Sequence, residues 1–404
     1  MKKAFKILRI QYDINGDQIK YISDMSQKKI LIITRNLPPL IGGMERLNWH
    51  IADELSREHE ILLLSHSQAK EQAPSKCIFF DVTLNPLSLF LILAFFKTLL
   101  ICLHHKPDVL FAGSGLTAPI VVFWAKFFRK KSIVYIHGLD IATNHWIYNL
   151  IWIPIIRMAD KVIANSTPTQ DICLKKGISQ EKLSIIYPGV TYPPLPRNEY
   201  LIDSIKEKYQ LHDKKILISV GRLTQRKGLN EFVDLTLPQI VSKHPNTMLV
   251  VIGDTPNQSL NKNLQSKELI LVTAQKHGIS NNILFLGNIN DDIVLSSWYY
   301  LADLHIFPVK HIPEDPEGFG MVAIEAAAHG TPTVAFKTGG IVDAVKDKKT
   351  GFLIENHDYE NFVEITLQIL KENDQLTTND CRNFANGFSW GELRKKFNRV
   401  ISHG

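Results

Sequence analysis

Short apolar runs alternate with longer segments of helical periodicity along most of the chain, and this alternation constrains the fold more than any other feature. The runs at residues 30–34, 61–65 and 109–112 have the length and composition of buried strands. Strands that alternate with helices in this way form a parallel sheet with helices on both faces. The sequence therefore predicts an α/β fold of doubly wound, Rossmann-like sheets, in which ligands bind beyond the carboxyl ends of the strands.

A proline-rich stretch at residues 187–196 separates two such series and is the expected linker. Further strands are predicted at residues 132–136, 161–164, 183–186, 216–220, 248–252, 283–286, 304–307, 333–335 and 351–354. A chain of 404 residues has room for two domains of ordinary size. We predict an N-terminal extension (1–28), a first domain (29–190), a second domain (191–384) and a C-terminal helix (385–404). Residues 1–24 are read either as a disordered extension or as the product of a misassigned start codon.

The composition is that of an ordinary globular protein, with 45% hydrophobic and 21% charged residues. The four cysteines show no CxxC pairing, which indicates a reducing compartment and no zinc site. Residues 1–29 lack the continuous apolar core of a signal peptide. We therefore expect a cytoplasmic protein.

Two carboxylates stand eight positions apart around a predicted helix start, in the stretch Glu317-Gly-Phe-Gly-Met-Val-Ala-Ile-Glu325. The helix predicted over residues 321–328 offers free N–H groups and a positive dipole end, which suit a phosphate. Gly318 and Gly320 let the backbone pass close to a ligand. The two carboxylates can then reach hydroxyls on either side of a diphosphate, which is the layout of a nucleotide sugar. Taken alone, the motif fits a buried helix with a solvent-facing Glu at each end equally well.

A cationic turn follows a second predicted strand, at residues 216–220. Gly221 ends that strand, and Arg222, Arg226 and Lys227 come within six positions. Arg offers a planar fork and Lys a mobile point charge, so the pattern suits a diphosphate. A solvated basic turn is the alternative.

Together the two motifs resemble those of the family-4 retaining glycosyltransferases, whose two-domain fold is called GT-B. The resemblance covers nearly the whole chain after about residue 29. It implies two Rossmann-like domains that face a central cleft, and a C-terminal helix that crosses back onto the first domain.

The resemblance also implies the site. The donor-binding residues it implies are Gly42, Gly43, Gly221, Arg222, Lys227, Glu317, Gly318, Phe319, Gly320, Met321, Val322 and Glu325. The catalytic residues it implies are His137, Glu317, Arg222 and Lys227. The two cations and the N–H groups near residues 319–322 would stabilise the leaving diphosphate. Glu317 would hold sugar hydroxyls, Glu325 the ribose diol, and His137 would lie near the transferred sugar.

The implied reaction retains the anomeric configuration and uses a nucleotide-diphosphate sugar of UDP or GDP type. No enzyme nucleophile is evident in the sequence, so front-face attack by the acceptor hydroxyl is expected rather than double displacement. We expect neither a cofactor nor a metal, because no Asp-x-Asp pair follows a strand. A dehydrogenase is excluded, since no strand is followed by GxGxxG.

The acceptor side is basic and contains a very apolar segment. Residues 1–190 carry 23 Lys and Arg against 15 Asp and Glu, and the segment 87–103 is interrupted only by Lys97. That segment is read as a packed core helix or as an interfacial one. The charge suits an anionic membrane surface, so we expect peripheral attachment to the inner face of the plasma membrane. Nucleic acid is not an expected partner, because the basic residues are dispersed.

The acceptor is expected to be a glycan or a lipid-linked molecule, in the synthesis of lipopolysaccharide or another surface polysaccharide. Two alternatives stay open: a soluble transferase acting on a small acceptor, and a catalytically silent subunit that binds a nucleotide sugar.

Overall fold

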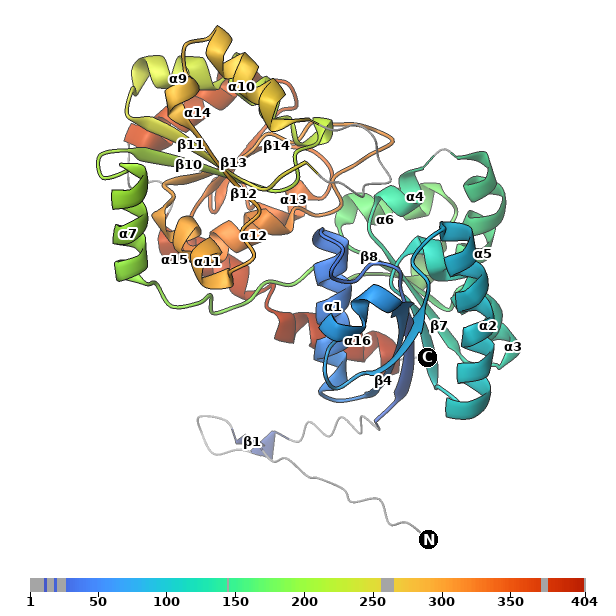
Figure 1. Ribbon diagram of the computed structural model, residues 1–404. Helices are drawn as coiled ribbons and strands as arrows, with labels where there is room; N and C mark the ends of the chain where they lie inside the picture. The colour runs from blue at the N-terminus through green and yellow to red at the C-terminus, as the bar shows by residue number, and fades with distance from the viewer. Residues whose placement is uncertain are drawn as a thin grey trace.

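The computed structural model describes residues 27–143, 145–255, 265–371 and 377–402, and the backbone of a two-stranded ribbon, β1 (Gln11–Tyr12) and β2 (Gln18–Ile19). Apart from this ribbon and residues 27 and 28, the predicted N-terminal extension lies outside the described residues. The chain forms two lobes, each built on a parallel sheet with helices on both faces (Figure 1). The predicted α/β architecture of two doubly wound sheets is confirmed.

The first sheet has seven parallel strands in the order β5-β4-β3-β6-β7-β8-β9. Its strands are β3 (Lys29–Ile33), β4 (Glu60–His66), β5 (Ile78–Val82), β6 (Val109–Ala112), β7 (Lys131–Ile136), β8 (Lys161–Ala164) and β9 (Leu183–Ile185). Its helices are α1 (Gly43–Ser56), α2 (Leu87–His105), α3 (Ala118–Phe127), α4 (Leu139–Ala142), α5 (Ile153–Arg157) and α6 (Thr167–Lys175).

Both faces of this sheet are buried because alternate side chains of a strand point to opposite sides. In β3, Leu31 and Ile33 belong to the core beneath α2 and α3. Ile30 and Ile32 belong to the core on the opposite face, beneath α1. This explains why the strand reads as a continuous apolar run.

The second sheet has six parallel strands in the order β12-β11-β10-β13-β14-β15. Its strands are β10 (Lys215–Val220), β11 (Thr247–Ile252), β12 (Ile283–Gly287), β13 (Leu304–Phe307), β14 (Thr333–Phe336) and β15 (Gly351–Ile354). Its helices are α7 (Glu199–Tyr209), α8 (Leu229–Leu235), α9 (Leu237–Lys243), α10 (Lys267–Lys276), α11 (Asp292–Leu301), α12 (Met321–His329), α13 (Ile341–Ala344), α14 (Tyr359–Lys371) and α15 (Thr378–Asn386).

Each sheet has one point where the strand order reverses, between β3 and β6 in the first and between β10 and β13 in the second. Ligands of doubly wound sheets bind in the crevice outside the carboxyl ends of the strands at such a point. The segments that follow three of these strands, β3, β10 and β13, contain Gly42 and Gly43, Gly221 to Lys227, and Glu317 to Gly320, respectively. The topology therefore concentrates the predicted site residues at the two switch points.

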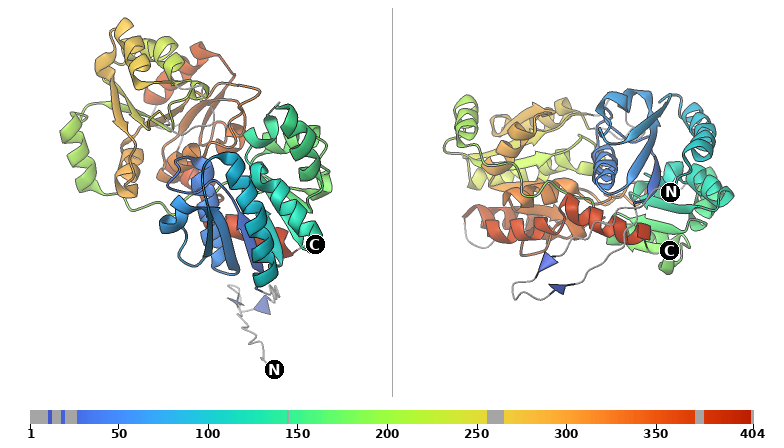
Figure 2. Two further views of the ribbon diagram at one scale, coloured as in Figure 1. Left: turned by 45° about the vertical axis from the view of Figure 1, so that its right-hand side comes forward. Right: turned by 90° about the horizontal axis from the view of Figure 1, so that it is seen from below.

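The last helix, α16 (Trp390–Ser402), crosses from the second lobe to pack on the first, as the two views of Figure 2 show. Leu393, Phe397 and Ile401 recur at four-residue spacing and are buried in the core of the first sheet. The predicted crossing helix is confirmed.

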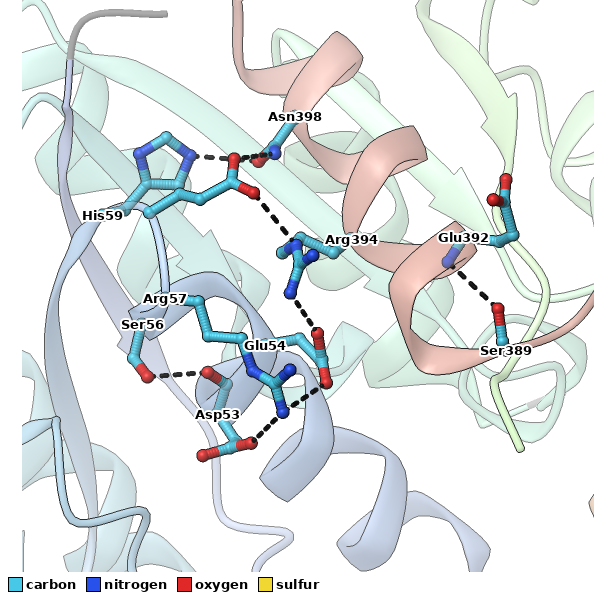
Figure 3. A network of polar contacts seen from close by, with 10 residues as sticks. Asp53, Glu54, Ser56, Arg57, His59, Ser389, Glu392, Arg394 and Asn398 are labelled. Carbon is cyan, nitrogen blue, oxygen red and sulfur yellow. Dashed lines mark hydrogen bonds and ion pairs between the residues drawn. The ribbon is translucent and has the colours of Figure 1, made fainter. Parts of the chain in front are cut away.

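Polar contacts fix the register of α16 on α1 (Figure 3). The guanidinium of Arg394 bonds Glu54 at 2.8 Å and Glu58 at 3.0 Å. Asn398 donates to Glu58 at 2.6 Å, and its amide oxygen lies 3.0 Å from Nε2 of His59. Because Glu54 is only 5% exposed, its pairing with Arg394 avoids an uncompensated buried charge.

Candidate active site

Two loops at the switch point of the second sheet bring a lysine and a glutamate into contact. Lys227 ends the short turn η5 (Gln225–Lys227) that follows β10, and Glu317 precedes α12 in the loop after β13. Since β10 and β13 are neighbours, Nζ of Lys227 lies 2.8 Å from Oε2 of Glu317. The two motifs recognised in the sequence therefore form one site.

Two further charged residues complete the group. Arg226 bonds the same Oε2 of Glu317 through Nη1, and its Nε lies 3.4 Å from Oδ1 of Asp315. The side chains alternate in sign in the order Asp315, Arg226, Glu317, Lys227, and each is between 12% and 18% exposed. We call these four residues the charge quartet. Arg222 and Lys227 are assigned to the site from the sequence but Arg226 is not, so the position of Arg226 on Glu317 is a feature that the sequence analysis missed.

The charge quartet shifts the pKa values of two of its members, Glu317 and Lys227. Burial alone would raise the pKa of Glu317, but Arg226 and Lys227 outweigh it and lower that pKa to about 2. Burial lowers the pKa of Lys227 to about 8, against the opposing attraction of Glu317. At neutral pH Glu317 is therefore ionised, and Lys227 is mostly charged but close to its titration range.

Two glycines of the Glu317 loop are required by protein contacts. A Cβ on Gly318 would lie 2.2 Å from the carbonyl oxygen of His137, so only glycine allows the two lobes to approach here. Gly320 has φ +90°, and a Cβ there would lie 2.8 Å from the ring of Phe307. From the sequence, Gly318 and Gly320 were expected to let the backbone pass close to a ligand, and that role stays a prediction.

The start of α12 is anchored on one side and faces the first lobe on the other. The buried ring of Phe319 packs against Tyr187 and Phe388, with ring centroids 5.5 and 5.7 Å away. Sδ of Met321 lies 3.7 Å from where a Cβ on Gly43 would be. The N–H groups of Met321 and Val322 come before the first bond of the helix start, which Ala323 donates to the carbonyl oxygen of Gly320 at 2.9 Å, and they are available to an anion.

Arg222 of the second lobe lies beside the glycine loop of the first lobe. Its Cζ is 3.7 Å from the position of a Cβ on Gly42, whose backbone is extended. In the part of the chain that the structure describes, the Arg222 guanidinium forms no ion pair with a carboxylate. A Cβ on Gly42 would also lie 2.3 Å from Oε2 of Glu45, the mobile end of a side chain that can turn away, so these protein contacts alone do not require glycine at this position.

His137 is buried at the end of β7, with only 6% of its surface exposed. Its Nε2 lies 2.7 Å from the carbonyl oxygen of Gly113, so Nε2 carries the proton and Nδ1 is left as an acceptor in the neutral ring. The carboxylate of Asp140 accepts from the N–H of His137 and from that of Gly115, both at 2.8 Å. His137 thus reaches the site with its backbone, beside Gly318; the predicted role of its imidazole stays a prediction.

Glu325 is bound from both lobes. Arg46 of α1 lies 2.7 Å from Oε1, and the hydroxyl of Tyr299 donates to Oε2 at 3.1 Å. Glu325 is 6% exposed, and its attraction is the largest cause of the raised pKa of Arg46. A carboxylate has about four acceptor positions, so two remain for the ribose diol that the sequence assigns to Glu325. That assignment stays a prediction.

A cavity of about 380 Å³ opens beside Glu325, between α1, α11 and the interlobe linker. Arg46, Tyr299 and Asp292 contribute to its walls. The lobes also meet where Asp343 accepts from the N–H and hydroxyl of Thr167, at 2.6 and 3.0 Å. Among the described residues, no group of three or more His, Cys, Asp or Glu side chains is placed to hold a metal ion.

The sequence matches two family descriptions, one for each lobe. "Glycosyltransferase Family 4" matches residues 41–192, and "Glycosyl transferases group 1" matches residues 202–387. The chain is a family-4 glycosyltransferase of the GT-B fold.

Relatives of this glycosyltransferase have names that refer to different products and donors. The capsular polysaccharide biosynthesis glycosyltransferase CapM of Staphylococcus aureus is 24% identical over 323 residues, which cover 76% of this chain and 80% of CapM. A GDP-mannose-dependent α-(1-6)-phosphatidylinositol monomannoside mannosyltransferase of Mycolicibacterium smegmatis is 23% identical over 347 residues, which cover 82% of this chain and 86% of the relative. Anabaena HepE, solved with UDP-glucose, superposes with a TM-score of 0.76 at 20% identity, covering 93% of this chain and all of HepE.

Proposed function

We propose that this glycosyltransferase transfers a sugar, with retention of configuration, from a nucleoside-diphosphate sugar to a glycan or lipid-linked acceptor of a surface polysaccharide. One observation carries the proposal. Arg222, which pairs with no carboxylate among the described residues, lies beside Gly42, and Met321 at the start of α12 lies beside Gly43. Lys227 lies close to Gly221, the residue before Arg222, so two cations and a helix start meet where the lobes face each other. This is a site for a dianionic group held between two lobes.

The chemistry follows from where charge develops. Cleavage of the bond between the anomeric carbon and the diphosphate oxygen leaves the electron pair on the leaving group. Arg222, Lys227 and the helix N–H groups stabilise that charge, which is the dominant kind of contribution at such sites. The acceptor hydroxyl attacks from the face that the leaving group vacates and gives its proton to the departing phosphate oxygen.

Glu317 suits a binding role better than a nucleophilic one. A carboxylate with its pKa lowered to about 2 and two cations on one oxygen is a weak base. Its other oxygen is left to accept from a sugar hydroxyl. Retention then comes from front-face attack, and the cations of the site supply the charge that a metal would otherwise provide.

The relatives support the substrate class. CapM is named for capsular polysaccharide, the mycobacterial relative for GDP-mannose and a phosphatidylinositol lipid, and HepE was solved with UDP-glucose. We accordingly propose a UDP or GDP sugar as donor, and a site of action at the cytoplasmic face of the plasma membrane.

A ligand screen followed by a transfer assay tests the proposal. Thermal shift with UDP, GDP and other nucleoside diphosphates, with and without a chelator, should identify one stabilising base and show no chelator effect. Hydrolysis of the matching sugar donor, and NMR of the product anomer, then test catalysis and retention. Binding without hydrolysis or transfer would favour the silent subunit, and transfer to a small sugar acceptor alone would favour the soluble enzyme.

A further inference from the structure

The outer surface of α2 and α3 exposes a continuous set of large apolar side chains. These residues are between 39% and 66% exposed: Leu89, Ile92, Leu93, Phe96, Leu100 and Leu103 on α2, and Phe123 and Phe127 on α3. We call this set the α2–α3 face. Figures 1 and 2 show both helices on the outer side of the first sheet, opposite α1 and α16. Soluble monomers rarely expose an apolar patch of this size without a partner.

The two helices form one surface because they are packed together along their sides. The rings of Phe95 and Phe123 lie 5.1 Å apart. The indole N–H of Trp124 donates to the carbonyl oxygen of Phe95 at 2.9 Å. The exposed stripes of α2 and α3 are therefore held in a fixed arrangement.

The helix α2 is long and apolar enough to cross a membrane, with 28% of its most apolar window buried. Its inner side, however, forms part of the domain core through Phe90, Ala94 and Ile101, all at most 2% exposed. A spanning orientation would strip these residues from the sheet. The helix is instead built to lie along a surface, with one face in the protein and the other in an apolar medium.

Charge favours a lipid surface over a second copy of the chain. Residues 82–139 contain six Lys and Arg and a single acidic residue, Asp108, which accepts from the backbone N–H of Lys29. Lys126 pairs with Asp160 at 3.1 Å, and a symmetric dimer through this face would bring the remaining excess of cations, including Lys106 and Lys130, from two copies together. Anionic headgroups would pair with these cations.

A hollow of about 250 Å³ lies at the C-terminal ends of the two helices. It is lined by Cys102, Leu103, Lys106, Pro107, Phe128 and Lys130. Two lysines beside an apolar hollow offer charge to a lipid phosphate and space to the first part of an acyl chain.

We propose that the α2–α3 face docks on an anionic phospholipid bilayer, with the axis of α2 along the membrane plane and Lys106 and Lys130 bound to lipid phosphate. The inference deepens the proposed function and rests on it for its purpose, since docking would hold the cleft near a lipid-linked acceptor. The binding itself is independent of catalysis.

Flotation of the full-length protein tests the docking surface. The vesicles are pure phosphatidylcholine, or phosphatidylcholine with phosphatidylglycerol, at low and high salt. The wild type should float with the phosphatidylglycerol vesicles at low salt, and weakly with the neutral ones. Phe96→Asp/Leu100→Asp should lower the partition coefficient at least tenfold. Lys106→Gln/Lys130→Gln should remove most of the preference for phosphatidylglycerol.

A matched control is Val272→Asp, which puts a charge on a residue 64% exposed on α10 and should float like the wild type. All variants should keep the wild-type melting temperature and nucleotide-induced thermal shift. Equal flotation of wild type and Phe96→Asp/Leu100→Asp would overturn the proposal, as would no flotation of the wild type. A wild-type dimer in sedimentation that this variant turns into a monomer would assign the face to a second copy. Failure of nucleotide binding or transfer, with flotation intact, would count against the proposed function alone.

Discussion

Lys227 should give the enzyme an alkaline limb in its pH profile, because its charge is needed by the leaving diphosphate and is lost at an unusually low pH. Burial lowers its pKa from 10.5 to about 8. As the pH rises through that value, the ammonium loses its proton and the site loses a cation. The pH dependence of kcat/KM for the donor reports ionisation in the free enzyme, where this pKa applies.

The size of the effect follows from the protonated fraction. With a pKa of about 8, roughly 90% of Lys227 is charged at pH 7, about 10% at pH 9 and about 1% at pH 10. We therefore expect kcat/KM to fall about tenfold per pH unit above 8. The fall should level off at the activity of Lys227→Ala, which we place roughly 30- to 1000-fold below the wild type, from the loss of about 2–4 kcal/mol of transition-state stabilisation.

Lys227→Arg separates this cause from ionisation of the substrate. Arginine stays protonated throughout the range, so the variant should be flat to pH 10 even if its overall rate is lower. Lys310→Arg, in a nearby loop where Lys310 pairs with Glu231, is the matched control and should keep the alkaline limb. The reasoning fails if the wild-type profile is flat between pH 7 and 10, or if Lys227→Arg keeps the limb unchanged. Melting temperatures across the same range exclude unfolding as the cause.

Three further outcomes are expected. Glu325→Ala should weaken binding of the nucleoside diphosphate in calorimetry. Glu317→Gln should impair transfer but leave that affinity equal or tighter, because a carboxylate that competes with the diphosphate is neutralised. Equal losses of affinity in the two variants would contradict this division of roles. Arg222→Ala should lower kcat/KM by a factor that corresponds to about 2–4 kcal/mol of lost transition-state stabilisation, with an unchanged melting temperature. Near-normal turnover of this variant would show that Arg222 does not bind the diphosphate. Phe397→Ala should lower the free energy of unfolding in urea by about 3–5 kcal/mol, because the ring is fully buried beneath the first sheet, while Ser402→Ala, an exposed neighbour on α16, should change it little.

Strands buried on both faces could be predicted from the sequence because they read as continuous apolar runs. The sequence did not predict β5, whose first four residues are exposed or half-buried and include Asp81. It lies at the edge of the sheet, where one side of the strand has no neighbour and its pattern is weak. The helical segment after Gly228 breaks at Thr236, before Pro238, and gives the two helices α8 and α9.

The core of the site was predictable for a topological reason. Lys227 and Glu317 are 90 residues apart, but each follows a strand at the switch point, and those strands are neighbours. Partners from the other lobe were not predictable, because no local pattern reports how two lobes sit together. Arg46 and Glu325 are 279 residues apart, and their contact depends on the packing of α1 beside α12. Their pairing is the clearest site feature that the sequence analysis missed; the position of Arg46 three residues after Gly43 gave the only signal.

In the mechanism that we propose, the charge quartet allows one lysine to serve two anions. Without a donor, Lys227 neutralises Glu317 at 2.8 Å. When a diphosphate occupies the cleft, it competes for that ammonium, and a carboxylate left buried without a partner would carry a large penalty. Arg226 removes the penalty, because it already bonds the same oxygen and is itself held by Asp315 at 3.4 Å. Lys227 can therefore turn to the leaving group while Glu317 stays ionised, fixed in place and ready to accept from the sugar.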